Sequence, residues 1–254
     1  MKNILMLIQA RMGSSRLPQK VLTEIAEKPL IQHLWDRLKK SQFIEHSAII
    51  TTTNKEDDQL VAYCNANHIP IHRGSDWDVL DRFYQSSLNY PNSDTIVRIC
   101  SDNPLHSYKV LDFVINQYLG SNVDYFSNSN HEPDYLEDGF DVEIFSKETL
   151  HTAWKNAKLL SEREHVTPYI KNSGLFKCAW KKACKDYHFK LSVDTENDRL
   201  AVEEIFKALR SIEDFSIEEV VTLLQEKPEI LKINQESIIN SGYLKSLKED
   251  KEIY

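Results

Sequence analysis

Residues 4–20 read ILMLIQARMGSSRLPQK, an apolar run that passes directly into a polar loop. Five consecutive apolar residues at 4–8 are typical of a short strand buried on both faces of a sheet. Pro29 then opens a segment in which apolar residues recur at helical spacing between Leu30 and Leu38. A buried strand, a polar loop and an amphipathic helix form the repeating unit of an α/β sheet, so this stretch predicts that fold class.

The same alternation continues along the chain. Short apolar runs at 48–50, 69–71 and 95–99 predict strands, and the amphipathic segments that follow them predict helices. This rhythm predicts a three-layer α/β/α architecture in which a mostly parallel, mixed sheet carries helices on both faces. The second half is less regular, with predicted strands at 123–126, 140–145 and 189–193. Ser161, Thr195 and Ser216 are expected to cap helices, and the charged tail at 244–254 is expected to be loosely ordered.

Composition and charge limit the class of protein. The net charge of -8 argues against a general nucleic-acid binder, which would carry a basic face. The four cysteines form no C-x-x-C pair, which favours reduced thiols over a zinc ribbon or a redox motif. The apolar run at 4–8 is too short for the core of a signal peptide, and no stretch approaches the ~20 apolar residues of a membrane helix. We therefore expect a cytoplasmic protein that binds neither membranes nor nucleic acid.

The loop after the first strand is the main candidate for a ligand site, because ligands of open α/β sheets bind beyond the carboxyl ends of the strands. It has one glycine where the dinucleotide fingerprint G-x-G-x-x-G has three, and it lacks the P-loop pattern. It carries Arg11, Arg16 and Lys20, with small residues at 13–15 that let the backbone approach a ligand. Three cations with hydroxyl and amide donors suit a triphosphate, and a solvated basic turn is the alternative.

Two aspartates follow predicted strands. Asp102 comes just after the strand at 95–99 and Asp194 ends the strand at 189–193, so both are expected at the same edge of the sheet. Two carboxylates, together with phosphate oxygens and waters, suit Mg²⁺. Each aspartate also suits a structural role, because residues 102–104 form a good turn sequence and Asp194 precedes a helix cap. Because a basic loop suited to phosphates is predicted at the same edge, we favour a shared metal-binding role for the two aspartates.

Residues 9–22, QARMGSSRLPQKVL, resemble the nucleotide loop of the acylneuraminate and CMP-Kdo cytidylyltransferases, in the branch named for the spore-coat polysaccharide protein SpsF. Further segments match that branch in the same order between residues 3 and 210: HRGS at 72–75 with DVLDR at 78–82, RICSDNPL at 98–105, GFDVE at 139–143, EHVTPY at 164–169 and VDTEND at 193–198. Gln19 stands where the family favours glycine, and Cys100-Ser101 stand where it often has Thr-Gly. Neither departure removes a charged group.

The resemblance implies a Rossmann-like nucleotidyltransferase fold of the GT-A type over residues 1–226, followed by a C-terminal helical tail at 227–254. It implies that Arg11, Arg16 and Lys20 hold the β- and γ-phosphates of CTP. With Asp102 these are the expected catalytic residues, and Asp102 and Asp194 are the expected Mg²⁺ ligands. The loop and the sheet edge are expected to contact the nucleotide through Gln9, Ala10, Arg11, Met12, Gly13, Ser14, Ser15, Arg16, Lys20, Arg73, Arg98 and Ser101. For Arg73 and Arg98, a surface ion pair is the alternative.

The acceptor side is expected to involve Asp141, Glu143, Arg163 and His165, although a lone histidine near a helix start is often structural. The expected reaction is in-line attack of an acceptor oxygen on the α-phosphorus of CTP, which releases pyrophosphate. The product would be a CMP-linked acidic sugar, or a related acceptor, for cell-surface polysaccharide. A phosphonate or phosphate acceptor is an alternative.

Two other functions fit parts of the sequence. The Asp76-Trp77-Asp78 pattern is typical of a sugar-nucleotide glycosyltransferase, unless Asp76 merely caps the helix that follows. A catalytically silent nucleotide-binding protein is a third reading. Proteins that resemble this chain often form homodimers through their mid-chain strands. The aromatic residues that permit such an interface here, and that equally suit an ordinary core, are Tyr125, Phe126, Tyr135, Phe140 and Phe145.

Overall fold

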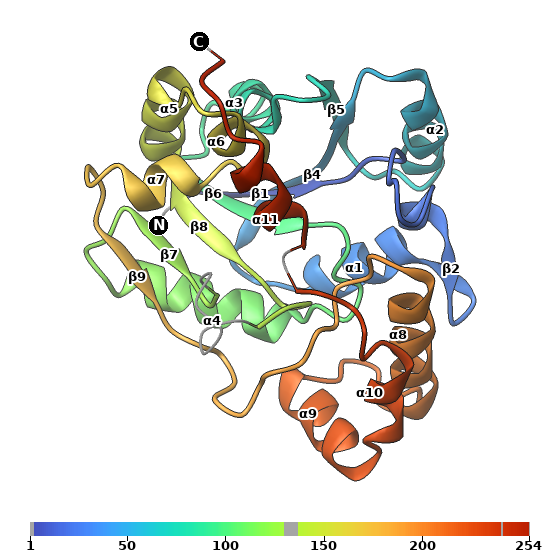
Figure 1. The fold of residues 1–254 in the computed structure, drawn as a ribbon. Coiled ribbons are helices and arrows are strands. Elements are labelled where there is room, and N and C mark those ends of the chain that lie inside the picture. The colour runs from blue at the N-terminus through green and yellow to red at the C-terminus, as the bar shows by residue number, and fades with distance from the viewer. Residues whose placement is uncertain (1–2, 130–136, 240, 254) are drawn as a thin grey trace.

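The computed structural model describes residues 3–129, 137–239 and 241–253. Its centre is a seven-stranded sheet with the order β5-β4-β1-β6-β8-β7-β9 (Figure 1). The strands are β1 (Ile4–Gln9), β4 (Ile44–Thr52), β5 (Ile71–Gly74), β6 (Thr95–Cys100), β7 (Tyr125–Ser127), β8 (Glu143–Ser146) and β9 (Cys178–Trp180). A separate two-stranded ribbon consists of β2 (Glu24–Ile25) and β3 (Lys28–Pro29).

The sheet is mixed and mostly parallel, as the sequence predicts. β1 runs parallel to both of its neighbours, and its last residue, Gln9, lies beside Ile50 of β4 and Cys100 of β6. β8 is antiparallel to β6 and to β7, while β7 and β9 are parallel to each other. The carboxyl ends of β1, β4, β5 and β6 therefore lie at one edge, where the first loop begins.

Helices cover both faces of the sheet because its central strands are apolar on both sides. Met6 and Ile8 of β1 pack into one core cluster, and Leu5 and Leu7 pack into the other. The first cluster draws on α1 (Leu30–Leu38), α2 (Asp58–Ala66), α4 (Tyr108–Leu119), α8 (Glu196–Ala208), α9 (Ile217–Glu226) and α10 (Glu229–Ile233). The second draws on α3 (Val79–Leu88), α5 (Lys147–Asn156) and α7 (Pro168–Asn172). In Figure 1 the helices α8 to α10 lie at the opposite end of the molecule from α3 and α5.

The segment at 189–193 is not a strand, and that prediction is wrong. The amides of Leu191 and Ser192 donate to Oδ1 of Asp138, at 2.8 and 2.7 Å. The amide of Val193 donates to the carbonyl oxygen of Asp102 at 2.8 Å. Leu191 and Val193 are buried, which is why the apolar pattern indicated a strand. A side-chain carboxylate occupies the place that a neighbouring strand would take in a sheet.

Two of the three predicted helix caps are confirmed. Thr195 Oγ1 accepts from the amide of Asp198 at the start of α8, and Ser216 Oγ accepts from the amide of Glu219 at the start of α9. Ser161 is not a cap, because α6 (Leu160–His165) already begins before it. Glu162 Oε2 instead accepts from the amide of Leu159 at 3.0 Å. The 3-10 turns are η1 (Lys20–Leu22) and η2 (Lys55–Asp57).

The C-terminal segment packs on α6 rather than lying loose, so the expectation of a loosely ordered tail is wrong. It contains α11 (Ser241–Lys248), which lies against α6. The Ser161 hydroxyl donates to Oδ2 of Asp250 at 2.7 Å, and the amide of Leu160 donates to the carbonyl of Lys251 at 2.9 Å. The charged residues of the tail therefore serve as hydrogen-bond acceptors for the start of α6.

The mid-chain aromatics belong to the protein's own core. Tyr125, Phe126, Phe140 and Phe145 are all buried within the single chain, and Tyr135 lies outside the described residues. These four side chains are therefore not available to a partner in this conformation. Among the described residues, no helix combines the length and apolar character that crossing a bilayer requires.

Candidate active site

Lys20 brings together the two aspartates that the sequence places at the sheet edge. Its Nζ lies 3.1 Å from Oδ2 of Asp102 and 3.1 Å from Oδ1 of Asp194, and it also donates to the carbonyl of Val193 at 2.8 Å. Burial opposes the charge on this amine, but the two carboxylates outweigh that cost and raise the pKa of Lys20 above its ordinary value. The expected proximity of Asp102 and Asp194 is thus confirmed, with a cationic group between them.

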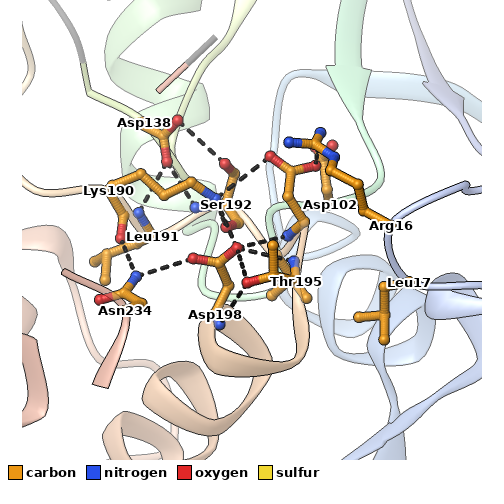
Figure 2. A network of polar contacts seen from close by, with 12 residues as sticks. Arg16, Leu17, Asp102, Asp138, Lys190, Leu191, Ser192, Thr195, Asp198 and Asn234 are labelled. Atoms are coloured by element: carbon orange, nitrogen blue, oxygen red, sulfur yellow. Dashed lines mark hydrogen bonds and ion pairs between the residues drawn. The ribbon is translucent and has the colours of Figure 1, made fainter. Parts of the chain in front are cut away.

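Asp194 is a carboxylate with three cationic side chains around it, those of Arg16, Lys20 and Lys190. Arg16 approaches its Oδ1 at 2.9 Å and Lys190 approaches its Oδ2 at 3.4 Å. Burial raises its pKa, but the charges of Lys20, Lys190 and Arg16 together hold the pKa below its ordinary value. Figure 2 shows how Lys190 reaches between this site and Asp198, whose buried carboxylate lies 3.1 Å from the amine. Asp194 is therefore ionised and held in place from three sides.

The first loop is held by the buried carboxylate of Asp57, which accepts hydrogen bonds from neutral groups. Asp57 Oδ1 accepts from the amide of Met12 at 2.6 Å, and its Oδ2 accepts from the amide and hydroxyl of Thr52. The Met12 side chain is buried in the core. The amide of Gln19 then donates to the Met12 carbonyl at 3.0 Å, which closes the loop. The small residues Gly13, Ser14 and Ser15 lie within the loop that these hydrogen bonds close.

Arg11 and the Asp76-Trp77-Asp78 pattern lie apart from the Lys20 centre. Arg11 approaches Oδ1 of Asp76 at 3.6 Å, and both side chains are about half exposed. Asp78 caps α3, accepting from the amide of Asp81 at 2.8 Å, and it also accepts from Nε of Arg163 at 3.0 Å. Since the two aspartates are engaged by different cations, they do not converge as a D-x-D metal site would. The geometry therefore disfavours the glycosyltransferase alternative.

Arg73 and Arg98 both form ion pairs within the protein. Arg73 donates to Oδ1 of Asp58 at 2.7 Å and to the carbonyl of Thr52 at 2.9 Å. Arg98 pairs with Glu143 on the neighbouring strand β8. Burial opposes the charge on Arg98, but neighbouring anionic groups, Glu143 among them, raise its pKa. The Arg73 pair is at the surface, as the alternative predicts, whereas the Arg98 pair is largely buried, and a contact with nucleotide stays a prediction for both arginines.

Glu143 lies at the centre of a buried polar network rather than at an open surface. Its carboxylate accepts from the hydroxyls of Tyr125 and Thr167, each at 2.6 Å, and lies 3.5 Å from Nζ of Lys171. Burial raises the pKa of Glu143, but Arg98 and Lys171 outweigh it and leave the pKa well below its ordinary range. This network fixes the position of the elements that flank the predicted acceptor side.

The other predicted acceptor residues are also held by protein groups. His165 Nε2 lies 2.8 Å from the hydroxyl of Ser246 in α11, and burial lowers its pKa to about 4, so the imidazole is neutral. Asp141 lies beside Asp138, and burial and that second carboxylate raise its pKa to about 8. Gly139 precedes it with φ of +94°, and a Cβ there would lie 2.9 Å from Cβ of Leu191. Glycine is needed at this position to bring the 138–141 segment against the 189–193 segment.

Comparison with known proteins identifies the family to which the chain belongs. A model of the cytidylyltransferase family matches residues 5–241. The chain belongs to the cytidylyltransferase family. The spore coat polysaccharide biosynthesis protein SpsF of Bacillus subtilis is 31% identical over 90% of this chain and 97% of its own length. An uncharacterised protein of Methanocaldococcus jannaschii is 39% identical over 91% of this chain and 94% of its own.

A solved structure extends the likeness to the fold. A cytidylyltransferase from Leptospira borgpetersenii superposes with a TM-score of 0.84 at 29% identity, covering 94% of this chain and 99% of that one. The family resemblance and the nucleotidyltransferase fold predicted from residues 9–22 and the later motifs are therefore confirmed. The sheet edge with Lys20, Asp102 and Asp194 is accordingly the candidate active site of a cytidylyltransferase.

Several residues that build this cytidylyltransferase site have no signal in the sequence analysis. Asp57 holds the first loop, Asp138 holds the 191–192 amides, and Lys190 neutralises Asp194. Asp57 lies in the acidic stretch 56–58, where nothing distinguishes it from its solvated neighbours.

Proposed function

We propose that this chain transfers CMP from CTP to a small acidic sugar or related acceptor, with release of pyrophosphate, for cell-surface polysaccharide synthesis. Membership of the cytidylyltransferase family supports the nucleotide, and the likeness to a spore coat polysaccharide protein supports the destination. In the reaction, an acceptor oxygen forms a bond to the α-phosphorus, the bond from that phosphorus to the oxygen shared with the β-phosphate breaks, and a proton on an acceptor hydroxyl passes to solvent. We also propose, from the family resemblance, that the protein acts as a homodimer in the cytoplasm.

The observation that carries this proposal is the meeting of Lys20, Arg16, Asp102 and Asp194 at the end of the first strand. Phosphoryl transfer depends on positioning and on neutralising charge more than on covalent chemistry. Lys20 and Arg16 are the cations that would bind the departing pyrophosphate. Arg11 extends the same basic loop on its outer side, where half of its side chain is exposed. The triphosphate would replace carboxylate oxygens as the partner of these cations.

The donor set also fits Mg²⁺. Asp102 and Asp194 already converge on one cationic group, at 3.1 Å each, and would hold the ion by their carboxylates. The described residues contain no group of three or more metal-ligating side chains, and Mg²⁺ commonly takes one or two carboxylates and completes its shell with phosphate and water. The ion would neutralise phosphate charge and hold the triphosphate in line.

A ligand-binding experiment tests the proposal without knowledge of the acceptor. Thermal unfolding is followed with CTP, UTP, ATP and GTP, each with Mg²⁺ and with chelator. A ligand at ~100 times its Kd stabilises the folded state by about 2.7 kcal/mol, which is readily measured. We expect stabilisation by CTP above the others, and more of it with Mg²⁺. No stabilisation by CTP would refute the proposal, while a positive result justifies an acceptor screen by pyrophosphate release.

The screen separates the remaining alternatives. Nonulosonic acids, other acidic sugars, and phosphonate or phosphate monoesters are supplied with CTP, and pyrophosphate is measured. Turnover with one class identifies the acceptor chemistry. CTP binding without turnover for any class would instead favour the silent nucleotide-binding protein.

A further inference from the structure

A cavity of about 390 Å³ lies between α1, the end of α8 and the segment that joins α8 to α9. Its walls include His33 and Arg37 of α1, Phe206 of α8 and Phe215 of the joining segment. The described residues that line it belong neither to the nucleotide loop nor to the pair of site aspartates. Pockets that bind small molecules have volumes of this order. This space, called here the α1–α8 cavity, is therefore large enough for an organic ligand.

Arg37 is a buried cation in the wall of this cavity. With 7% of its surface exposed, it donates from Nε to the carbonyl of His106 at 2.8 Å and from Nη2 to that of Phe215 at 2.6 Å. Its Nη1 has no hydrogen-bond partner, and its guanidinium forms no ion pair, in the part of the chain that the structure describes. Burial lowers the pKa of Arg37 to about 10, so the group stays charged at neutral pH. Because a buried charge without a counter-ion is costly, this wall favours an anionic ligand.

The lining of the cavity is positively charged, although the chain as a whole carries a net charge of -8. Its cationic side chains are those of Lys28, Arg37, Lys39, Lys40 and Arg210, and its acidic side chains are those of Asp36, Glu213 and Asp214. Burial lowers the pKa of His33, so the imidazole adds no positive charge at neutral pH. The lining thus has two more positive than negative groups. A phosphomonoester carries about two negative charges above its second pKa of about 6, and it balances this surplus.

Some of these cations have part of their bonding capacity left for a ligand. Arg210 is exposed and forms no ion pair within residues 3–129, 137–239 and 241–253. Lys28 and Lys39 share one carboxylate, that of Asp36, at 3.0 and 2.7 Å. Guanidinium and ammonium groups are the side chains that most often bind phosphate oxygens. The cavity therefore offers several phosphate donors beside the buried guanidinium.

We infer that the α1–α8 cavity binds a phosphomonoester of a small organic molecule, and that this ligand is an effector of the transfer site. The phosphate would accept hydrogen bonds from Arg37 and Arg210. Phe206, Leu209 and Ile212 also line the cavity and would contact the organic group. This site goes beyond CMP transfer, and its binding of a phosphate does not depend on that reaction. Its role as an effector site rests on the proposed function.

The cavity adjoins the ribbon that follows Lys20 in the chain. Lys28 of β3 lines the cavity, and His33 donates from Nε2 to the carbonyl of Ile25 in β2 at 2.6 Å. The amide of Thr23 donates to the carbonyl of Lys20 at 3.1 Å, which ties the ribbon to the turn at 20–22. A phosphate that binds the amine of Lys28 would therefore act on the ribbon next to Lys20. This connection gives the ligand a physical route to the nucleotide loop.

The first experiment measures binding by calorimetry at pH 8, without CTP. The probes are phenyl phosphate, which carries two negative charges at this pH, and phenyl sulfate, which carries one on the same ring. We expect phenyl phosphate to bind, and phenyl sulfate to bind about tenfold more weakly. Absence of phenyl phosphate binding would overturn the inference.

Three variants locate the bound phosphate. Arg210→Glu should weaken binding of phenyl phosphate about tenfold or more, because a cation of the lining becomes an anion. Lys232→Glu makes the same change in charge at an exposed position of α10 outside the lining, and it should bind as the wild type does. Lys20→Met should also keep the wild-type affinity. Loss of binding in Lys20→Met, with binding kept in Arg210→Glu, would place the phosphate at the nucleotide loop and overturn the inference.

The second experiment measures the affinity for CTP with Mg²⁺ at rising concentrations of phenyl phosphate. We expect a change of about fivefold or more that levels off, because coupling between two separate sites saturates. Arg210→Glu should bind CTP as the wild type does without phenyl phosphate, and it should not respond to the probe. A CTP affinity that the probe leaves unchanged, or that falls without limit as in direct competition, would overturn the effector role. No binding of CTP would refute the proposed function, and the titrations without CTP would still decide whether the cavity binds phosphate.

Discussion

Nζ of Lys20 stands equally close, at 3.1 Å, to a carboxylate oxygen of Asp102 and to one of Asp194, which lie 82 and 174 positions further along the chain. Three segments remote in sequence therefore share one buried amine. Because both aspartates are satisfied by a cation that belongs to the nucleotide loop, the loop and the predicted metal ligands are electrostatically linked. A ligand that binds the amine of Lys20 would therefore also change the charge next to Asp102 and Asp194.

Replacing Lys20 by methionine should abolish most turnover. The amine is the buried cation of the loop, with its side chain 12% exposed, and removal of one preorganised group that stabilises transition-state charge costs on the order of 10²-fold in rate. Pyrophosphate release at saturating CTP and acceptor measures the effect. Lys39→Met is the control, since Lys39 is half exposed just after the end of α1 and pairs with Asp36. A Lys20→Met enzyme with the control's rate would remove Lys20 from the catalytic residues.

The double variant Asp102→Asn with Asp194→Asn should lose the response to Mg²⁺. Amide oxygens carry no charge, and Mg²⁺ favours carboxylates. We expect CTP to stabilise the wild type more strongly with Mg²⁺ than with chelator, and the double variant equally in both. The difference in melting temperature between the two conditions is the measurement. A double variant that kept the wild-type Mg²⁺ response and turnover would show that the ion is held elsewhere or is not used.

The sequence predicts the basic loop of the site because the residues of this loop are close together in the chain. Arg11, Arg16 and Lys20 lie in one loop after an apolar strand, so their placement follows from the strand and the rule for open sheets. Asp102 followed from a strand predicted at the right place, and the structure has β6 there. Asp194 is predicted at the same edge for a partly wrong reason, since 189–193 is not a strand and is not part of the sheet.

The supporting residues were not predictable from the sequence because their partners are remote. Asp138 binds amides 53 and 54 positions away, and Asp57 binds an amide 45 positions away. No periodicity or spacing encodes such contacts. The same limit applies to Arg163 and Glu143, which are predicted from the sequence to lie on the acceptor side. Their buried partners, Asp78 and Arg98, become apparent after the chain is folded.

Removing Arg163 should destabilise the fold more than it changes the chemistry. Arg163 and Asp78 are both 4% exposed at their side chains, so Arg163→Met would leave a buried carboxylate without its main partner. Breaking a buried pair in this way costs about 3–5 kcal/mol in the free energy of unfolding, which urea denaturation measures. Lys207→Met removes the ion pairs of the exposed Lys207 with Glu203 and Glu204 on α8 and should cost far less, because exposed ion pairs contribute little to stability. Similar losses in the two variants would contradict the structural role of the Arg163 pair.

Asp141 should make stability fall as the pH rises through the neutral range. Burial and the neighbouring Asp138 raise the pKa of Asp141 from its ordinary 3.8 to about 8, so the folded protein retains a proton that the unfolded chain releases. Below about pH 4 both states are protonated and the group has no effect on stability. Between about pH 4 and pH 8 the folded state binds more protons, and stability declines by at most about 1.4 kcal/mol for each pH unit.

The variant Asp141→Asn isolates this contribution, because an amide keeps an acceptor oxygen and does not ionise. We expect the variant and the wild type to unfold at similar urea concentrations near about pH 4, and the variant to be the more stable near about pH 8. Asp186→Asn, at an exposed position, is the control and should follow the wild type at every pH. If Asp141→Asn gave no advantage at the higher pH, the carboxyl would be ionised in the folded protein at little cost. Asp141 would then be free to act as a charged ligand for the acceptor at neutral pH.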